Sequence, residues 1–239
     1  TQYGVTINPE TEICALIGSK EGIAHLPLAI LNPGDISLVP EPGYPVYHIG
    51  TMLAGAETHF LPLRRENRFL PDLGAIPSRV LERAKLLYLN YPNNPTASAA
   101  DKDFLLDAIN FCRAHDIIIA YDAAYSDIYY DEHPVPFLSL PGAREVGIEF
   151  HSLSKTFNMT GWRIGWAVGN ASIISALSRL KENVDSGVFE AVQAAGIAAL
   201  RGPARVVEEI RDVYRRRRDM FSSGLQRMGL EIIMPAGTF

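Results

Sequence analysis

One segment of this sequence combines a lysine, two serines and an arginine at spacings that could do chemistry. It reads Ser152-Leu-Ser-Lys-Thr-Phe-Asn-Met-Thr-Gly-Trp-Arg163, with Lys155 eight residues before Arg163. Apolar runs flank it on both sides and would hold Lys155 out of bulk water, which lowers a lysine pKa and makes the amine a nucleophile toward carbonyl groups. Arg163, Ser152 and Ser154 are suited to bind phosphate oxygens. Taken alone, a lysine between serines is more often a solvated surface side chain.

Three other segments carry polar groups at the ends of predicted apolar strands or at the start of a helix. Asp122 ends the run Ile117–Asp122, where a carboxylate could pair with a protonated ring nitrogen. The amides of Tyr91-Pro-Asn-Asn-Pro-Thr96 could hydrogen-bond a phenolic oxygen. Gly18-Ser-Lys-Glu-Gly22 begins a predicted helix, where free N–H groups favour an anion. Singly, these are better read as a helix cap, a turn and a flexible loop.

Together these groups suit a ligand that carries one aldehyde and one phosphate. Pyridoxal 5′-phosphate (PLP) is such a molecule, with a pyridine ring that Asp122 could keep protonated. The residues therefore predict a PLP site in which Lys155 is the reactive amine. We assign no metal ligands.

Short apolar runs alternate with longer amphipathic ones, which predicts βαβ units and a mostly parallel sheet buried on both faces. The expected strands are Ile36–Pro40, Thr58–Leu63, Lys85–Tyr91, Ile117–Asp122, Gly147–Leu153 and Ile164–Val168, with a further one at Leu230–Met234. The expected helices are Lys20–Leu31, Asp101–His115, Ala171–Asp185, Val188–Leu200 and Pro203–Met228.

Three details of these helices are also predicted. Asp101 is a plausible N-cap for the helix that follows it. Pro27 lies inside Lys20–Leu31 and predicts a kink or a late start. The run Arg215–Arg218 is expected to form a solvated helix face rather than an anion site.

Composition excludes several classes of protein. The 239 residues carry 22 Lys+Arg against 27 Asp+Glu, a net charge of −5, which argues against binding a nucleic-acid backbone. The apolar runs are far shorter than the ~20 residues of a membrane span, and no leader opens the chain. Only Cys14 and Cys112 are present, too few for a disulfide framework. We therefore expect a cytoplasmic protein. The chain opens without Met and closes just after the predicted strand Leu230–Met234, so we expect a fragment of a longer protein.

The motifs Asn-Asn-Pro-Thr, Asp-Ala-Ala-Tyr and Ser-Leu-Ser-Lys with its later Arg resemble those of the fold-type I, class I/II PLP-dependent aminotransferases. The resemblance covers essentially the whole chain. Two longer segments, Gly18-Ser-Lys-Glu-Gly-Ile-Ala-His25 and Pro42-Gly-Tyr-Pro-Val-Tyr47, are similar to those of the LL-diaminopimelate aminotransferase branch of this family. The resemblance implies an α/β fold with a mostly parallel, seven-stranded-type sheet and helices on both faces. It also implies a PLP-binding large domain over 1–210, followed by the start of an incomplete small domain over 211–239.

The resemblance also implies a role for each site residue. Lys155 would hold the cofactor covalently, Asp122 would face the pyridine nitrogen, and that pairing would lower the pKa of Asp122. Asn94 and Tyr125 would hydrogen-bond the phenolic oxygen, and Tyr44 would stack on the ring. The phosphate would lie among Ser19, Lys20, Ser152, Ser154 and Arg163.

Two departures from the family pattern stand out. Ala97 replaces a glycine that many relatives have after Asn-Pro-Thr, so we expect an ordinary negative φ there. The resemblance also implies an arginine that clamps the substrate carboxylate, in a C-terminal part expected beyond residue 239.

The function expected from the resemblance is transfer of an amino group between LL-2,6-diaminopimelate and 2-oxoglutarate by a homodimer. The segment 183–200 is a candidate dimer contact, and an ordinary core helix is an equal alternative. An alanine, aspartate or aromatic aminotransferase, a PLP-dependent lyase, and a PLP-binding remnant without turnover stay open as alternatives.

Overall fold

The computed structural model describes residues 4–239 and has a seven-stranded sheet at its centre. The strands are β1 (Ile13–Leu16), β2 (Ile36–Glu41), β3 (Glu57–Pro62), β4 (Ala84–Asn90), β5 (Ile118–Asp122), β6 (Gly147–Ser152) and β7 (Gly165–Gly169). The α-helices are α1 (Ser19–Ile30), α2 (Val46–Leu53), α3 (Ser78–Leu81), α4 (Lys102–His115), α5 (Ala143–Val146), α6 (Leu153–Thr156), α7 (Ala171–Val184), α8 (Glu190–Arg201) and α9 (Arg205–Arg227).

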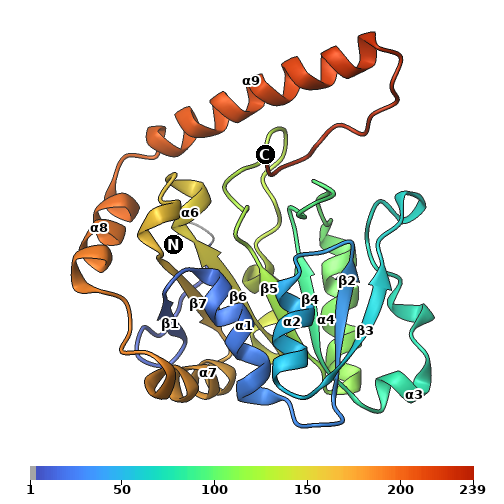
Figure 1. Ribbon diagram of the computed structural model, residues 1–239, viewed down its shortest axis with the longest axis vertical. Coiled ribbons are helices and arrows are strands. Elements are labelled where there is room, and N and C mark those ends of the chain that lie inside the picture. The colour runs from blue at the N-terminus through green and yellow to red at the C-terminus, as the bar shows by residue number, and fades with distance from the viewer. Residues whose placement is uncertain (1–3) are drawn as a thin grey trace.

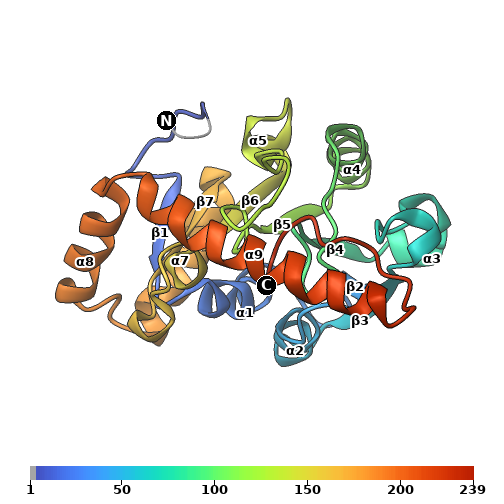
Figure 2. The same ribbon diagram turned by 90° about the horizontal axis from the view of Figure 1, so that it is seen from above.

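The strand order is β1-β7-β6-β5-β4-β2-β3, in which β3, β2, β4, β5 and β6 run parallel. Helices α1, α2 and α7 cover one face and α4 and α5 the other, while α9 crosses above the carboxyl ends of the parallel strands (Figures 1 and 2). The predicted α/β class, with a mostly parallel sheet covered on both faces, is confirmed.

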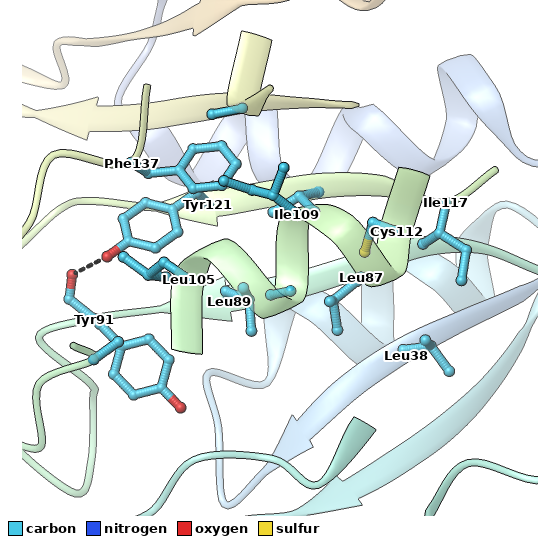
Figure 3. Close-up of a cluster of buried hydrophobic side chains, with 14 of the residues drawn as sticks. Leu38, Leu87, Leu89, Tyr91, Leu105, Ile109, Cys112, Ile117, Tyr121 and Phe137 are labelled. Atoms are coloured by element: carbon cyan, nitrogen blue, oxygen red, sulfur yellow. Dashed lines mark hydrogen bonds between the residues drawn. The ribbon is translucent and has the colours of Figure 1, made fainter. Parts of the chain in front are cut away.

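The central strands bury side chains on both faces. In β4, Leu87 and Leu89 join the cluster under α4 that Figure 3 shows, whereas Leu86 and Tyr88 pack under α1 and α2 on the opposite face. This explains why the strand reads as a continuous apolar run instead of an alternating one. Such a strand cannot shift without disturbing both cores, so the sheet fixes where each strand ends.

The strand β1 was not predicted. It pairs antiparallel with β7, and β7 pairs antiparallel with β6, so the sheet is mixed at this edge. In β1 only Leu16 is fully buried, because the strand lies at the edge of the sheet. Four residues with one buried side chain carry too weak a pattern for recognition from sequence.

Pro27 does not delay α1, which starts at Ser19 and continues to Ile30. A proline inside a helix leaves the carbonyl four residues earlier without its usual N–H partner. Here that carbonyl belongs to Ile23, and the buried hydroxyl of Tyr88 donates to it at 3.2 Å. The expectation of a late start was wrong because a side chain of β4 replaces the missing donor.

The expected strand at Leu230–Met234 is also absent, since these residues have no regular secondary structure. The chain instead returns from the end of α9 to the loop after β5, where the N–H of Thr238 donates to Ile128 O at 2.9 Å. Tyr129 and Gly237 form an isolated antiparallel bridge there. The apolar residues of 230–234 therefore occur in a returning segment rather than in a strand.

The run Arg215–Arg218 is not a uniformly solvated face, contrary to expectation. Arg218 lies over the Tyr130 ring, 4.5 Å from its centroid, and donates to Asp131 at 3.1 Å and to Pro235 O at 3.2 Å. Arg215 donates to Tyr130 O at 2.8 Å. Two of the four arginines thus fasten α9 to the loop after β5.

Two expectations concern the chain as a whole: a domain boundary after residue 210 and the absence of membrane spans. The expected domain boundary after residue 210 falls inside the continuous helix α9. None of the helices within residues 4–239 combines the length and the apolar composition that a membrane crossing requires.

Candidate active site

All the residues predicted to form the site line one cavity of about 440 Å³ at the carboxyl edge of the parallel strands. They are Ser19, Lys20, Tyr44, Asn94, Asp122, Tyr125, Ser152, Ser154, Lys155 and Arg163. Asn90, Ala124 and Thr160 complete the lining. Ser19 and Arg163, which are 144 positions apart in the chain, meet here because β1 ends where its antiparallel neighbour β7 begins. The neighbouring parallel strands end at the same edge and bring the other residues there.

Lys155 lies on the short helix α6, directly after β6. Its Nζ is 5.6 Å from the centroid of the Tyr125 ring and 5.2 Å from that of Phe239. Burial lowers the pKa of Lys155, the positive charge of Arg163 lowers it further, and the carboxylate of Asp122 opposes both. The net lowered pKa increases the fraction of neutral amine, which is the nucleophilic form.

Asp122 is the last residue of β5 and is buried. The hydroxyl of Tyr47 donates to its Oδ2 at 2.8 Å, and the N–H of Ala124 donates to its Oδ1 at 3.1 Å. Burial nevertheless raises the pKa of Asp122, although these hydrogen bonds and the charges of His151 and Lys155 act in the opposite direction. The sequence predicted a lowered pKa for Asp122 beside a pyridinium. In the protein without a ligand the pKa of Asp122 is instead raised, because desolvation is the largest effect.

Asn90 fixes the loop that carries Asn94. Its Nδ2 donates to Asp122 O at 2.8 Å, and its Oδ1 accepts the N–H of Asn94 at 2.8 Å. The side chain therefore ties the end of β4 to the end of β5 and sets the position of Asn94 relative to Asp122.

Two tyrosines flank the cavity. The Tyr44 ring lies 5.8 Å from Lys20 Nζ and meets the Tyr47 ring edge-on at 5.9 Å. Tyr125 lies just beyond β5, and burial, with the charge of Asp122, raises its pKa. Its hydroxyl therefore stays protonated at neutral pH.

Cationic side chains and the first residues of α1 lie together in the cavity. Gly18 caps the helix with φ 76°, and a Cβ there would collide with the guanidinium of Arg163. Arg163 donates to Thr160 O at 3.0 Å and reaches Ser154 Oγ at 3.5 Å. With Ser19 and Lys20 opening the helix, this end has the donors and the positive charge that an anion requires.

The groups that support Asp122 were not predicted from the sequence. Tyr47, which donates to it, is fully buried and stacks on Tyr88 with ring centroids 4.6 Å apart. On β6, the imidazole Nε2 of His151 is 2.8 Å from Glu149 Oε2, and both side chains are buried. Two charged or ionisable residues at alternate positions of a buried strand, Glu149 and His151, were the signal that could have revealed the second pair.

Ala97 contradicts its prediction, because it has φ 57° in the left-handed region. The turn around it is closed by the N–H of Ala97 on Asn93 O at 2.8 Å and by the N–H of Asn93 on Ser98 O at 2.9 Å. The carbonyl of Ala97 in turn accepts the N–H of Ala236 at 2.9 Å. These hydrogen bonds fix Ala97 in the left-handed conformation.

The protein has an α/β fold with a cavity at the carboxyl edge of its sheet. The cavity brings together cationic side chains that suit an anion, the Lys155 amine with its lowered pKa and the buried carboxylate of Asp122. The chain belongs to the family described as aminotransferase class I and II, whose model matches residues 1–239.

Two curated relatives of high sequence identity share one name. A protein of Moorella thermoacetica named LL-diaminopimelate aminotransferase is 57% identical over 238 residues, covering 99% of this chain and 61% of that protein. A protein of the same name from Syntrophobacter fumaroxidans is 54% identical, covering 100% of this chain and 62% of that protein. The chain thus spans about 61% of the length of these relatives.

Solved structures share the fold. The apo structure of BacF from Bacillus subtilis matches with a TM-score of 0.96 at 45% identity, covering 99% of this chain and 60% of that one. A probable N-succinyldiaminopimelate aminotransferase from Thermus thermophilus matches with a TM-score of 0.93 at 38% identity, covering 100% of this chain and 64% of that one.

Proposed function

We propose that this chain provides the PLP-binding part of an aminotransferase that moves an amino group between LL-2,6-diaminopimelate and 2-oxoglutarate. The observation that carries the proposal is the lowered pKa of the Lys155 amine in a cavity that it shares with Arg163 and buried Asp122. The substrate pair is supported by the names of the relatives at 57% and 54% identity.

The residues present fit PLP. The cations and N–H groups around Ser19, Lys20 and Arg163 would hold the phosphate, and the glycine at position 18 leaves room for the guanidinium. Lys155 would bind the aldehyde carbon. Asp122 would hold the proton on the ring nitrogen, with Asn94 and Tyr125 on the phenolic oxygen and Tyr44 against the ring. PLP, when bound, supplies an electron-poor ring that stabilises negative charge at the substrate Cα.

Lys155 would also carry the proton in the proposed reaction. Once an amino donor had displaced it, its free amine would take the proton from the substrate Cα, and its lowered pKa increases the fraction of the neutral amine that can do so. The same amine would then deliver that proton to the carbon that entered as the cofactor's aldehyde. The carboxylate of Asp122 is fixed in a buried position, where it would stabilise the protonated ring nitrogen. Because it is fixed before the ligand binds, this stabilisation requires no reorganisation of solvent.

The first test concerns the reactive amine. Lys155→Ala should abolish the visible absorbance band that forms when the protein is incubated with PLP, because the amine that forms the covalent link is gone. Lys85→Ala is the matched control, since Lys85 is a surface lysine paired with Asp116 and lies outside the cavity. An unchanged spectrum for Lys155→Ala would reject the assignment.

The second test concerns the substrate. The complete protein should use LL-2,6-diaminopimelate as amino donor in preference to alanine, aspartate and aromatic amino acids, with 2-oxoglutarate as acceptor. Preference for another donor would keep the aminotransferase chemistry and replace the substrate. PLP binding without turnover of any of these donors would indicate a binding module.

Three further points belong to the proposal. The division into a large domain over 1–210 and the start of a small domain over 211–239 follows the family pattern. A homodimer with contacts over 183–200 is supported by the exposed side chains of Phe189, Ile197 and Leu200 in that segment. A cytoplasmic location is supported by Cys14 and Cys112, which are both free thiols.

A further inference from the structure

A cluster of charged side chains at the first turn of α1 contributes no residue to the lining of the cavity. At its centre is Lys181 of α7, whose side chain is only 8% exposed. Its Nζ donates to Glu21 Oε2 at 3.0 Å and to the two carboxylate oxygens of Asp185 at 2.7 and 2.8 Å. One ammonium group therefore joins the first turn of α1 to the end of α7.

Glu21 connects this cluster to the backbone of the phosphate-binding turn. Its Oε2 accepts the N–H of Ile17 at 2.8 Å, and its Oε1 is 3.1 Å from Nδ1 of His25. Gly18, the N-cap of α1, has no side chain with which to close the turn. Glu21 performs that closing role from inside the helix, so the positions of Ser19 and Lys20 depend on where its carboxylate is held.

The same carboxylate is a difficulty for an anion site. Glu21 belongs to the first turn of the helix whose N-terminus faces the cavity, so an unpaired charge there would repel a phosphate dianion. Lys181, which does not line the cavity, offsets part of this charge, because its ammonium is shared between Glu21 and Asp185. Burial by itself would lower the pKa of Lys181, but its hydrogen bonds to Asp185 and Glu21 outweigh burial and raise it, so the ammonium stays charged at neutral pH.

The remaining members of the cluster hold Lys181 in place. Asp185 also accepts the N–H of Gly187 at 2.7 Å, which fixes its carboxylate at the end of α7. Lys181 is therefore held by two carboxylates whose own positions are set by backbone donors, Ile17 for Glu21 and Gly187 for Asp185.

We propose that Lys181 and Glu21 are positioning residues for the phosphate end of the cavity: Glu21 closes the turn that presents Ser19 and Lys20, and Lys181 holds Glu21 in place and offsets part of its charge. Neither residue touches the ligand. The inference rests on the proposed PLP site and adds residues to it that the family resemblance did not supply.

The test compares PLP with pyridoxal, which has the same aldehyde and ring and lacks the phosphate. Lys181→Met in the complete protein should weaken PLP binding about tenfold, the size of one partly buried charge interaction of about 1.4 kcal/mol. Pyridoxal binding should change less than about twofold, because its contacts do not involve the start of α1. Both affinities are read from the absorbance change on titration, without turnover.

Rescue separates positioning from general damage. In the double variant Glu21→Gln with Lys181→Met, the amide oxygen can still accept the Ile17 N–H and no carboxylate is left unpaired at the turn, so PLP affinity should largely recover. Glu21→Gln alone should bind PLP at least as tightly as the unmodified protein, and it provides the test if Lys181→Met does not fold. Arg113→Met is the matched control, because its ion pair with Glu145 lies on α4 and α5, away from the cavity.

Several results would overturn the inference. Unchanged PLP affinity in Lys181→Met would do so, as would an equal loss for PLP and pyridoxal, or a tenfold loss in Glu21→Gln alone. If the unmodified protein fails to bind PLP, the proposed function falls first, and that result is distinct from all of these.

Discussion

Asp122 carries a carboxyl group in a buried position that disfavours its charged form. It lies at the end of the central strand β5, where burial raises its pKa, and the Tyr47 hydroxyl and the Ala124 N–H offset only part of this cost. A residue in such a position is destabilising for the protein by itself and favourable only when a cationic partner enters the cavity. Its environment thus favours ligand binding over stability.

This conflict predicts a pH dependence. In the protein without PLP, Asp122 has a pKa above its ordinary value of 3.8, so the folded state binds more protons than the unfolded state once the pH exceeds that value. The free energy of unfolding therefore decreases as the pH rises from about 4 through the raised pKa of Asp122, because the carboxyl group must then lose its proton in a buried position. Asp122→Asn removes the titration, so its stability relative to the unmodified protein should increase over that range by about 1.4 kcal/mol for each unit of pKa shift.

Urea unfolding at a series of pH values, without and with PLP, measures this difference. Saturating PLP should diminish the trend in the unmodified protein, because a cation then faces the carboxylate. A difference between the two proteins that stays constant from about pH 4 to pH 8 would contradict the account of Asp122.

At the scale of the elements, the site is built by turns and strand ends rather than by any one helix. The loop from β4 to α4 shows how: Asn90 orients Asn94, and the left-handed Ala97 directs its carbonyl to Ala236 in the C-terminal segment. The loop therefore connects the cavity to the segment that brings Phe239 beside Lys155. Its conformation is set by these tertiary hydrogen bonds.

Ala97→Gly should stabilise the protein by about 1 kcal/mol, because glycine adopts positive φ without the steric cost that alanine incurs. The free energy of unfolding in urea measures the effect. Ala99→Gly is the matched control: Ala99 is exposed in the same loop and is outside the positive-φ residues, so glycine there should be neutral or destabilising. Equal effects of the two substitutions would show that strain at position 97 is negligible.

At the scale of the whole molecule, α9 lies across the carboxyl edge of the sheet (Figure 2) and is fastened over the site by Arg215 and Arg218. Helix α8 lies beside the β1 edge and has little of its surface buried. The segment 183–200 leaves Phe189 74% exposed, together with Ile197 and Leu200. A large exposed apolar surface of this kind is typical of protein–protein contacts.

Phe189→Glu should therefore weaken the proposed homodimer of the complete protein by more than tenfold, since it places a charge in an apolar contact. Sedimentation over a range of concentrations measures the dimer dissociation constant. Phe60→Glu is the control, because Phe60 is an exposed aromatic residue on β3, at the opposite edge of the sheet. A dimer unaffected by Phe189→Glu would place the contact elsewhere.

The amino-acid sequence by itself predicted the α/β architecture and the residues that line one cavity at the carboxyl edge of the sheet. Continuous apolar runs such as that of β4 specify strands buried on both faces, and Asp122 and Lys155 follow such runs directly, so their meeting at one edge follows from parallel topology. The capping role of Asp101 was equally local, and the structure confirms it with a 2.9 Å hydrogen bond from the N–H of Phe104.

Tertiary structure alone decided the features that depend on partners distant in the chain. The Ile23 carbonyl freed by Pro27 meets Tyr88, Ala97 is held by Ala236, Arg218 packs on Tyr130, and Tyr47 reaches Asp122. In each case a local preference was overruled or completed by a group at least 65 positions away. Periodicity and turn chemistry report only on neighbours in the chain, whereas these contacts arise from three-dimensional packing.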